Sequence, residues 1–206
     1  MAKIKAFANY SKEYDEWFDN NSELYNAELC LIKSMTESDY KRSLEIGVGT
    51  GKFAVPLNIK IGVEPCPQMA HKAKKQGVSV ISSIAEHLPF KDNTFDFILM
   101  VTTVCFVDDV LKSFEEAYRT LKPGGSFIVA YVDKNSELGR RYELKKGKSR
   151  FYQEATFYGT EDILKSLKFA KFNSFDIKQT IFNSKQVDLI LNGYGKGSFV
   201  AILAKK

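Results

Sequence analysis

The sequence is poor in cysteine, proline and glycine, and it has no long apolar run. It contains three cysteines, five prolines and thirteen glycines in 206 residues. Cys30, Cys66 and Cys105 form no C-x-x-C pair and are odd in number, which argues against a disulfide framework and a cysteine-rich zinc site. The low glycine and proline content excludes collagen-like and low-complexity chains. The longest apolar stretch, residues 97–107, falls short of the ~18 residues that a membrane span needs.

The sequence also shows no evident signal peptide and no strong charge of one sign. The N-terminal residues MAKIKAFANY have no apolar core of the kind that signal peptides carry, so we expect a cytoplasmic protein without membrane association. Thirty basic against 25 acidic residues give a net charge of +5, which solubility explains more simply than an anionic partner. Neither histidine, His71 or His87, belongs to a metal-ligand spacing, so no metal is expected.

What the sequence does have is size and aromatic residues. A length of 206 residues corresponds to one domain at about 150 residues each, with room for added segments. Sixteen Phe, ten Tyr and one Trp supply enough apolar surface for a core and exclude disorder as the main state. We therefore expect residues 1–206 to form a single domain.

From residue 42 onward, short apolar runs alternate with helical patterns. The predicted strands are Arg42–Gly47, Lys60–Glu64, Val78–Ser82, Phe95–Val101 and Ser126–Val132, and the predicted helices are Thr50–Leu57, Pro67–Gln76, Asp108–Leu121 and Thr160–Ala170, the last capped by Thr160. This alternation predicts an α/β fold with a doubly wound, Rossmann-like and mostly parallel sheet. Two further alternating segments, Ser174–Phe182 and Ser198–Ala204, predict an antiparallel hairpin at the sheet edge, with residues 183–197 as a loop and seven strands altogether.

Two segments stand outside this rhythm. Residues 7–35 are helical in pattern, and Tyr10, Tyr14 and Trp17 fall on one helix face, so we expect a helical cap. Residues 133–156 are rich in Lys and Arg and include aromatic side chains. We expect this second segment, the lid, to be helical in part and to lie over one edge of the sheet.

The sharpest local feature is a glycine-rich turn between a predicted strand and a helix. The dinucleotide fingerprint G-x-G-x-x-G requires glycine at position 52, where Lys52 stands. A P-loop requires glycine at position 46 and Ser or Thr at position 53, where Ile46 and Phe53 stand. The remaining pattern is E-x-G-x-G-x-G, formed by Glu45, Gly47, Gly49 and Gly51. In open α/β sheets such a turn lies where ligands bind, at the carboxyl ends of the strands.

That pattern resembles motif I of the class I S-adenosylmethionine-dependent methyltransferases. Further landmarks follow in the order in which that family has them: Gly62-Val63-Glu64-Pro65, Ala85-Glu86-His87-Leu88-Pro89-Phe90, Asp92-Asn93-Thr94-Phe95-Asp96, Leu121-Lys122-Pro123-Gly124-Gly125 and Phe157-Tyr158-Gly159-Thr160-Glu161-Asp162. The passage at residues 85–96 is similar to that of the small-molecule branch, of the type 11 kind. The resemblance covers roughly residues 10–172.

The resemblance implies S-adenosylmethionine as cofactor and a set of residues that hold it. Glu64, with Pro65 after it, would bind the ribose hydroxyls, for which a carboxylate offers a bidentate charge-assisted contact. Glu45 would belong to the contacts near the methionine amino group, and the Ala85 N–H would meet the adenine. The implied cofactor residues are Glu45, Gly47, Gly49, Gly51, Glu64, Pro65, Ala85, Glu86, Met100, Val101 and Thr102, of which the last three would line the sulfur side.

Two positions depart from the family pattern. Ile84 stands where the family often has an acidic residue for the adenine amino group, and whether Glu86 replaces it is left open. Cys105 stands where many relatives have a histidine, and its apolar neighbours favour a buried, inert thiol. No catalytic base is therefore assigned.

The predicted reaction is methyl transfer to a small-molecule acceptor, with catalysis mainly by orientation. Candidate acceptor contacts are Tyr10, Tyr14, Trp17, Tyr142 and Tyr152. An aromatic site suits an apolar or cationic acceptor, whereas the basic lid suits an acid or phosphate, and the sequence does not choose between them. The acceptor, the methylated atom and the oligomeric state stay open.

Three alternatives remain. Residues 134–150 carry seven Lys or Arg and two acids, which can follow phosphates, so an RNA methyltransferase is one alternative, although no RNA-binding motif accompanies the run. A non-catalytic cofactor-binding module of the same fold is a second. A nicotinamide oxidoreductase is a third, and Lys52 argues against it.

Overall fold

A single mixed sheet organises the molecule. The structure is a computed structural model that describes residues 3–36, 40–182 and 188–206. Its sheet has eight strands in the order β3-β2-β1-β4-β5-β8-β6-β7. The strands are β1 (Ser43–Ile46), β2 (Ile61–Val63), β3 (Ser79–Ile81), β4 (Phe95–Val101), β5 (Leu121–Val132), β6 (Ser174–Thr180), β7 (Leu191–Asn192) and β8 (Phe199–Lys205).

The predicted fold class is confirmed. Strands β1 to β5 pair in parallel, whereas β8 pairs antiparallel with both β5 and β6. The sheet exceeds the expected seven strands because Leu191–Asn192, inside the predicted loop 183–197, pairs with β6 as the short strand β7. Residues 183–187 of that predicted loop lie outside the described residues.

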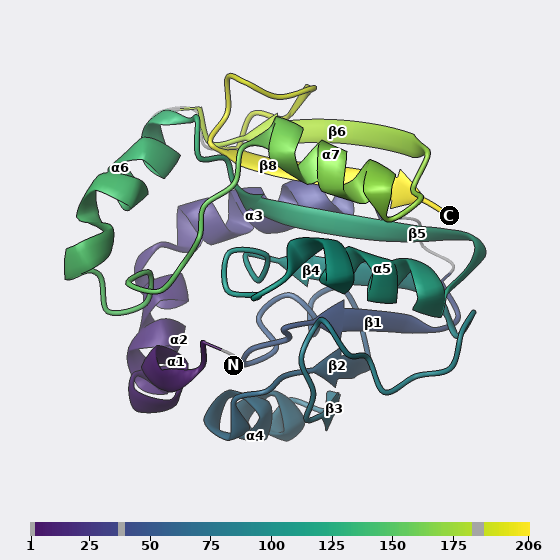
Figure 1. Cartoon of the computed structure of the whole chain (residues 1–206). Coiled ribbons are helices and arrows are strands. Elements are labelled where there is room, and N and C mark those ends of the chain that lie inside the picture. The colour runs from purple at the N-terminus through teal and green to yellow at the C-terminus, as the bar shows by residue number, and fades with distance from the viewer. Residues whose placement is uncertain (1–2, 37–39, 183–187) are drawn as a thin grey trace.

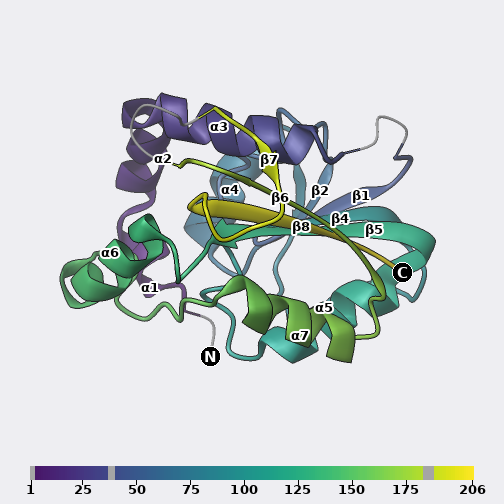
Figure 2. The ribbon, with the colours of Figure 1, turned by 90° about the horizontal axis from the view of Figure 1, so that it is seen from above.

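Helices cover both faces of the sheet, as Figures 1 and 2 show. The helices are α1 (Lys5–Asn9), α2 (Ser11–Asn20), α3 (Ser22–Lys33), α4 (Pro67–Lys75), α5 (Val110–Thr120), α6 (Glu137–Lys145) and α7 (Thr160–Phe169), with a short 3-10 turn at Lys146–Lys148. Helices α5 and α7 lie on one face, and α3 and α4 lie on the other (Figure 2). Strand β4 separates the two cores by its alternation: Ile98 and Met100 belong to the core under α5 and α7, and Leu99 and Val101 to the core under the N-terminal helices.

Three local expectations were wrong. Residues 50–57 form a series of turns instead of a helix, with Pro56 inside them. The cap of α7 is Gly159 instead of Thr160: the Gly159 N–H donates to Asp162 Oδ2 at 3.1 Å. The Thr160 hydroxyl instead donates to Asp133 Oδ2 at 2.6 Å and so ties α7 to the end of β5. The strand predicted at Ser126–Val132 begins earlier: β5 starts at Leu121 and contains the Lys-Pro-Gly-Gly segment, where the pairing with β4 shifts register.

The helical cap and the lid meet at one end of the sheet. The cap consists of α1, α2 and α3, and α6 forms the helical part of the lid. The lid meets the cap through Phe151, whose ring centre lies 5.6 Å from that of Phe7 on α1 and 6.3 Å from that of Tyr10. In Figure 1 both segments lie at the same end of the molecule, with α6 above α1 and α2. That end of the sheet is the one to which the carboxyl ends of β1 and β4 point.

Candidate functional site

A cavity of about 190 Å³ lies between the carboxyl ends of the parallel strands and the two covering segments. Residues from the glycine turn, the ends of β2 and β4, the loop after β3, the helical cap and the lid all line it. It opens at the point where the strand order reverses between β1 and β4. Open α/β sheets bind their ligands at this switch point.

The glycine turn closes the floor of the cavity. Gly47 and Gly49 line it and adopt φ angles of +70° and +56°, a region that side chains disfavour. A Cβ on Gly47 would lie 2.3 Å from Thr103 Oγ1, so the turn and the end of β4 approach each other only because residue 47 is glycine. Gly51 does not line the cavity, since its missing Cβ faces Val55 and Ala73.

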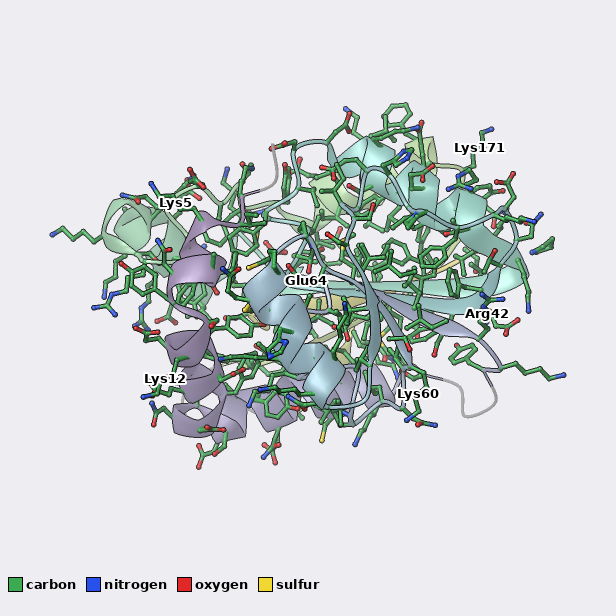
Figure 3. All side chains as sticks on the ribbon, turned by 90° about the horizontal axis from the view of Figure 1, so that it is seen from below. Lys5, Lys12, Arg42, Lys60, Glu64 and Lys171 are labelled. Atoms are coloured by element: carbon green, nitrogen blue, oxygen red, sulfur yellow. The ribbon has the colours of Figure 1, made fainter. Side chains whose placement is uncertain are left out.

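Glu64 is held beside this turn by backbone groups. Its Oε2 accepts the Gly49 N–H at 3.0 Å and its Oε1 accepts the Cys66 N–H at 2.8 Å. Burial raises the pKa of Glu64, and these two hydrogen bonds oppose the rise. Figure 3 shows Glu64 in the interior, beside the start of α4. Each oxygen keeps a second acceptor position, so a pair of hydroxyl groups fits this carboxylate.

Glu45 lies behind the turn and does not line the cavity. It is 2% exposed, and its Oε2 has no hydrogen-bond partner within the described residues. Burial raises its pKa well above the usual range, opposed by a hydrogen bond from the Ala54 backbone and reinforced by the charge of Glu64. An unsatisfied buried carboxyl oxygen is costly, and a cationic or N–H donor reaching it would lower that cost.

The loop after β3 forms the third wall. Ala85 and Glu86 line the cavity together with Ser83 and Ile84. The Glu86 Oε1 accepts the N–H groups of Asp108 and Asp109 at 2.7 and 3.2 Å, so this carboxylate joins two cavity loops.

The guanidinium group of Arg119 on α5 also holds the loop after β3. Arg119 donates to the carbonyl oxygens of Leu88 and Phe90 at 3.0 and 2.8 Å and pairs with Glu116 and Asp92. Glu116 in turn accepts the Leu88 N–H at 2.8 Å. The loop that carries Ala85 is therefore fixed to α5 by charge-assisted hydrogen bonds.

Of the three residues at the end of β4 that are expected to contact the cofactor sulfur, two line the cavity and one does not. Val101 and Thr102 line the cavity, and so does Pro65. Met100 points to the other side of the sheet, where it is fully buried in the core under α5 and α7. Thr102 has a φ of +48°, held by its N–H bond to the Ala130 carbonyl at 2.8 Å. A β-branched residue in this region is strained, and such strain is typical of functional sites.

Aromatic side chains from the cap and the lid form the remaining wall. Tyr14, Trp17, Tyr142 and Tyr152 line the cavity, as expected of acceptor contacts. Tyr10 does not: the guanidinium of Arg150 lies 5.3 Å from its ring centre. Its ring also meets Phe151 edge-on, so Tyr10 joins the cap to the lid.

An acidic residue of the cap fixes this wall to the glycine turn. Asp15 accepts the Thr50 hydroxyl on Oδ1 at 2.7 Å and pairs through Oδ2 with Lys72 of α4 at 2.8 Å. The same Lys72 ammonium donates to the Ser11 carbonyl at 2.6 Å. Side chains of the glycine turn and of α4 thus hold helix α2 in place.

Several cavity residues were missed at the sequence level. They include Phe7, Glu28, Thr103, Phe106 and Phe151. The Phe7 ring packs edge-on against Phe106 at 4.9 Å, which closes the space between the cap and the loop after β4. The sequence signal for Phe7 was its place on the aromatic helix, but its register could not be read because the cap breaks into three helices.

Comparison with known proteins places this site in a family. The profile of the family described as "Methyltransferase domain" matches residues 44–129, which include the glycine turn, Glu64 and Ala85. A structure from Thermotoga maritima, described as a "SAM-dependent methyltransferase, possible histamine N-methyltransferase", is 46% identical and superposes with a TM-score of 0.95, covering 98% of this chain and 99% of that one. The chain belongs to the class I S-adenosylmethionine-dependent methyltransferase family.

Two further proteins are similar to this methyltransferase in sequence. An uncharacterized protein of Methanocaldococcus jannaschii is 44% identical over 208 residues, covering 98% of this chain and all of the relative. A ubiquinone/menaquinone biosynthesis C-methyltransferase of Rickettsia prowazekii is 32% identical over 112 residues, which span 46% of this chain and 45% of that protein. The methyl donor of the family is S-adenosylmethionine.

The residues of the methyltransferase fit that cofactor. Glu64 offers oxygens to a pair of hydroxyls, the Gly47–Gly49 turn leaves room that a Cβ would fill, and Glu45 Oε2 lacks a donor. Within the described residues no group of three or more His, Cys, Asp or Glu is arranged to hold a metal ion. No helix in that same part of the chain has both the length and the apolar character needed to cross a bilayer.

Proposed function

We propose that this methyltransferase transfers a methyl group to a small-molecule acceptor bound between the glycine turn and the aromatic wall. The observation that carries the proposal is the composition of one cavity: motif residues line one side, and Tyr14, Trp17, Tyr142 and Tyr152 line the other. The helical cap and the lid belong, in this proposal, to a single domain over residues 1–206. The Thermotoga maritima relative, named a possible histamine N-methyltransferase, supports a small acceptor.

The chain's own groups position both reactants. Glu64 would bind the ribose hydroxyls and Ala85 would meet the adenine, while Glu45 would attract the methionine amino group from behind the turn. Bound S-adenosylmethionine would supply an electrophilic methyl carbon with a sulfur leaving group that keeps the electron pair. The protein aligns the acceptor and excludes water, an effect worth ~7–11 kcal/mol at best.

The thiol near the site does not act as a base. Cys105 is buried, and burial raises its pKa to about 12. Its Sγ donates to the Thr102 carbonyl at 3.1 Å, which leaves the thiol protonated and occupied at neutral pH. This geometry supports a structural role for Cys105.

The distribution of charge favours a small acceptor over RNA. The basic side chains labelled in Figure 3 lie around the periphery and do not converge on Glu64; they are Lys5, Lys12, Arg42, Lys60 and Lys171. Aromatic rings that could stack bases, such as Tyr142 and Tyr152, instead stack on each other at 5.0 Å. An RNA substrate needs a continuous basic track into the site.

Calorimetric titration tests the proposal. The purified protein is titrated with S-adenosylmethionine, S-adenosylhomocysteine and NAD, beside a Glu64→Ala variant and a matched Glu161→Ala variant on exposed α7. We expect micromolar binding of both sulfur nucleotides, lost in Glu64→Ala and unchanged in Glu161→Ala. A binding isotherm for NAD alone, or equal nucleotide affinity in all three proteins, would overturn the assigned site.

A second measurement separates the alternatives. Methyl transfer from labelled cofactor is followed with a panel of small amines, phenols and acids, and with structured RNA. Turnover of a small molecule with no labelling of RNA supports the proposal. Labelled RNA would establish the RNA alternative, and nucleotide binding without any labelled product would establish a non-catalytic module.

A further inference from the structure

Helix α3 places a carboxyl group inside the aromatic wall of the cavity. Glu28 is 6% exposed and lines the cavity together with Trp17, Tyr142 and Tyr152. Within the described residues it makes no hydrogen bond and no ion pair. The other buried carboxylates of the site differ, because Glu64 accepts two backbone N–H groups and Glu45 is hydrogen-bonded by the Ala54 backbone.

Three tyrosines line the cavity together with this carboxyl: Tyr14 on α2, Tyr142 on α6 and Tyr152 in the lid. Burial is the main cause that raises the pKa of these three and of Tyr25 on α3, and the charge of Glu28 adds to the rise in all four. Their raised pKa values keep all four phenols protonated and neutral at physiological pH. The Tyr25 hydroxyl itself donates to the Lys52 carbonyl at 2.6 Å. Lys3, a basic residue of the cavity lining, donates instead to the Val107 carbonyl at 3.3 Å.

An unpaired buried carboxyl has a definite physical preference. Burial, as the sole cause, raises the pKa of Glu28 to about 8. The group is therefore mostly protonated at pH 7 in the protein alone. A cation that enters the cavity stabilises the ionised form, and the surrounding ring faces add cation–π attraction. An anionic or neutral acceptor would leave the carboxyl protonated and would gain no charge pairing from it.

We propose that Glu28 binds the amino group of the acceptor, and that the acceptor is a small amine which is a cation in solution. The carboxylate takes one proton from the bound ammonium, N–H to Oε, which leaves a lone pair on nitrogen for the methyl carbon. The product leaves as an N-methylammonium ion, and Glu28 returns the proton to water. This assignment rests on the proposed methyl transfer and names its acceptor class.

The position of Glu28 agrees with this role. It belongs to the aromatic wall and not to the glycine turn, so it contacts the acceptor side of the cavity. Of the other candidate bases, Cys105 stays protonated, His71 and His87 are exposed, and Glu86 accepts two backbone N–H groups. Because the pKa of Glu28 lies near that of an amine, the proton can be shared between the two at small cost.

Amine binding to the protein loaded with S-adenosylhomocysteine tests the proposed role of Glu28. The protein saturated with S-adenosylhomocysteine is titrated with histamine, 2-phenylethylamine and tryptamine, each beside the alcohol of the same shape. The variant is Glu28→Gln, which keeps the volume and removes the charge. The matched control is Glu23→Gln on the exposed face of the same helix. Affinity for S-adenosylhomocysteine is measured in all three proteins.

We expect at least one amine to bind the wild type at least tenfold more tightly than its alcohol. Glu28→Gln should abolish that preference, whereas Glu23→Gln should keep it. The proposal is overturned if no amine binds the loaded wild type, or if the preference survives in Glu28→Gln. Loss of S-adenosylhomocysteine binding in the wild type would instead refute the proposed function itself, so the two failures are distinguishable.

The proton transfer has its own measurement. Single-turnover methylation of the tightest-binding amine is followed from pH 7 to pH 9. In the wild type we expect the methylation rate to change little with pH, because the proton stays within the Glu28–amine pair. In Glu28→Gln the rate should rise by about tenfold per pH unit, since water must then remove the proton. Parallel profiles in the two proteins, or no methylation of an amine that binds, would exclude Glu28 as proton acceptor.

Discussion

Replacing Glu28 by glutamine should stabilise the fold, and by an amount that depends on pH. The carboxyl ionises near 4.5 in the unfolded chain and at about 8 in the folded protein, because burial disfavours its charge. The folded state therefore holds more protons than the unfolded state between these two values. Stability from this group is fully present below pH 4.5 and is lost as the pH rises toward 8.

The magnitude follows from the two pKa values. Between pH 5 and pH 8, a carboxyl that ionises at 4.5 unfolded and at about 8 folded lowers the free energy of unfolding by about 3–4 kcal/mol. The amide that replaces the carboxyl in Glu28→Gln does not titrate, so the variant lacks this loss. We expect Glu28→Gln to match the wild type within about 1 kcal/mol at pH 5 and to exceed it by about 3–4 kcal/mol at pH 8.

Urea unfolding of both proteins at pH 5, 6, 7 and 8 measures this difference. The raised pKa values of Glu45 and Glu64 also make the wild type pH-dependent, but they occur in both proteins and cancel in the comparison. Glu23→Gln, with an exposed carboxylate, should track the wild type throughout. A stability gap that stays constant from pH 5 to pH 8 would show that the Glu28 carboxyl ionises normally and is solvated or paired.

Three further perturbations probe the walls of the cavity. Gly47→Ala forces a side chain into a φ of +70° and against the end of β4, so it should lose about 1–3 kcal/mol of stability in urea unfolding and abolish S-adenosylhomocysteine binding; an unaffected affinity would contradict the close approach. Arg119→Met removes the donor to the Leu88 carbonyl and should weaken nucleotide binding by about tenfold in calorimetry, with Lys112→Met as an exposed control. Asp15→Asn weakens the hold of the cap on the turn and should cost about 1.5 kcal/mol of stability in the same unfolding assay, with no change in the far-UV spectrum.

Much of the fold was predictable because its signals are local. Each parallel strand is a short apolar run followed by a turn, and β4, with all but one of its residues buried, reads directly from Phe95–Val101. The turns at residues 50–57 were misread as a helix because their apolar spacing, Phe53, Ala54 and Leu57, is helical, while Pro56 and the packing against the cap decide otherwise. Such tertiary packing has no local signature.

The site was predictable where motifs carry it and not where packing does. Gly47, Gly49, Glu64 and Ala85 follow from residue pattern alone, and all line the cavity. Glu28 was missed because an acidic residue in a helix normally faces water, and only the crossing of α3 over the sheet buries it. The prediction for Met100 was wrong because the sequence does not show which face of the sheet each β4 side chain points to. Side chains alternate along β4, and Met100 points into the core under α5 and α7.

The aromatic wall also bears on how the family diverges. Residues 44–129, matched by the family profile, contain the glycine turn, Glu64 and Ala85, whereas Trp17, Glu28, Tyr142 and Tyr152 lie outside them. The portion that the family profile describes is thus the portion to which we assign nucleotide binding. On the proposed assignment, replacing the cap and the lid changes the acceptor and leaves the methyl donor the same, so we expect relatives that share only the central portion to differ in acceptor.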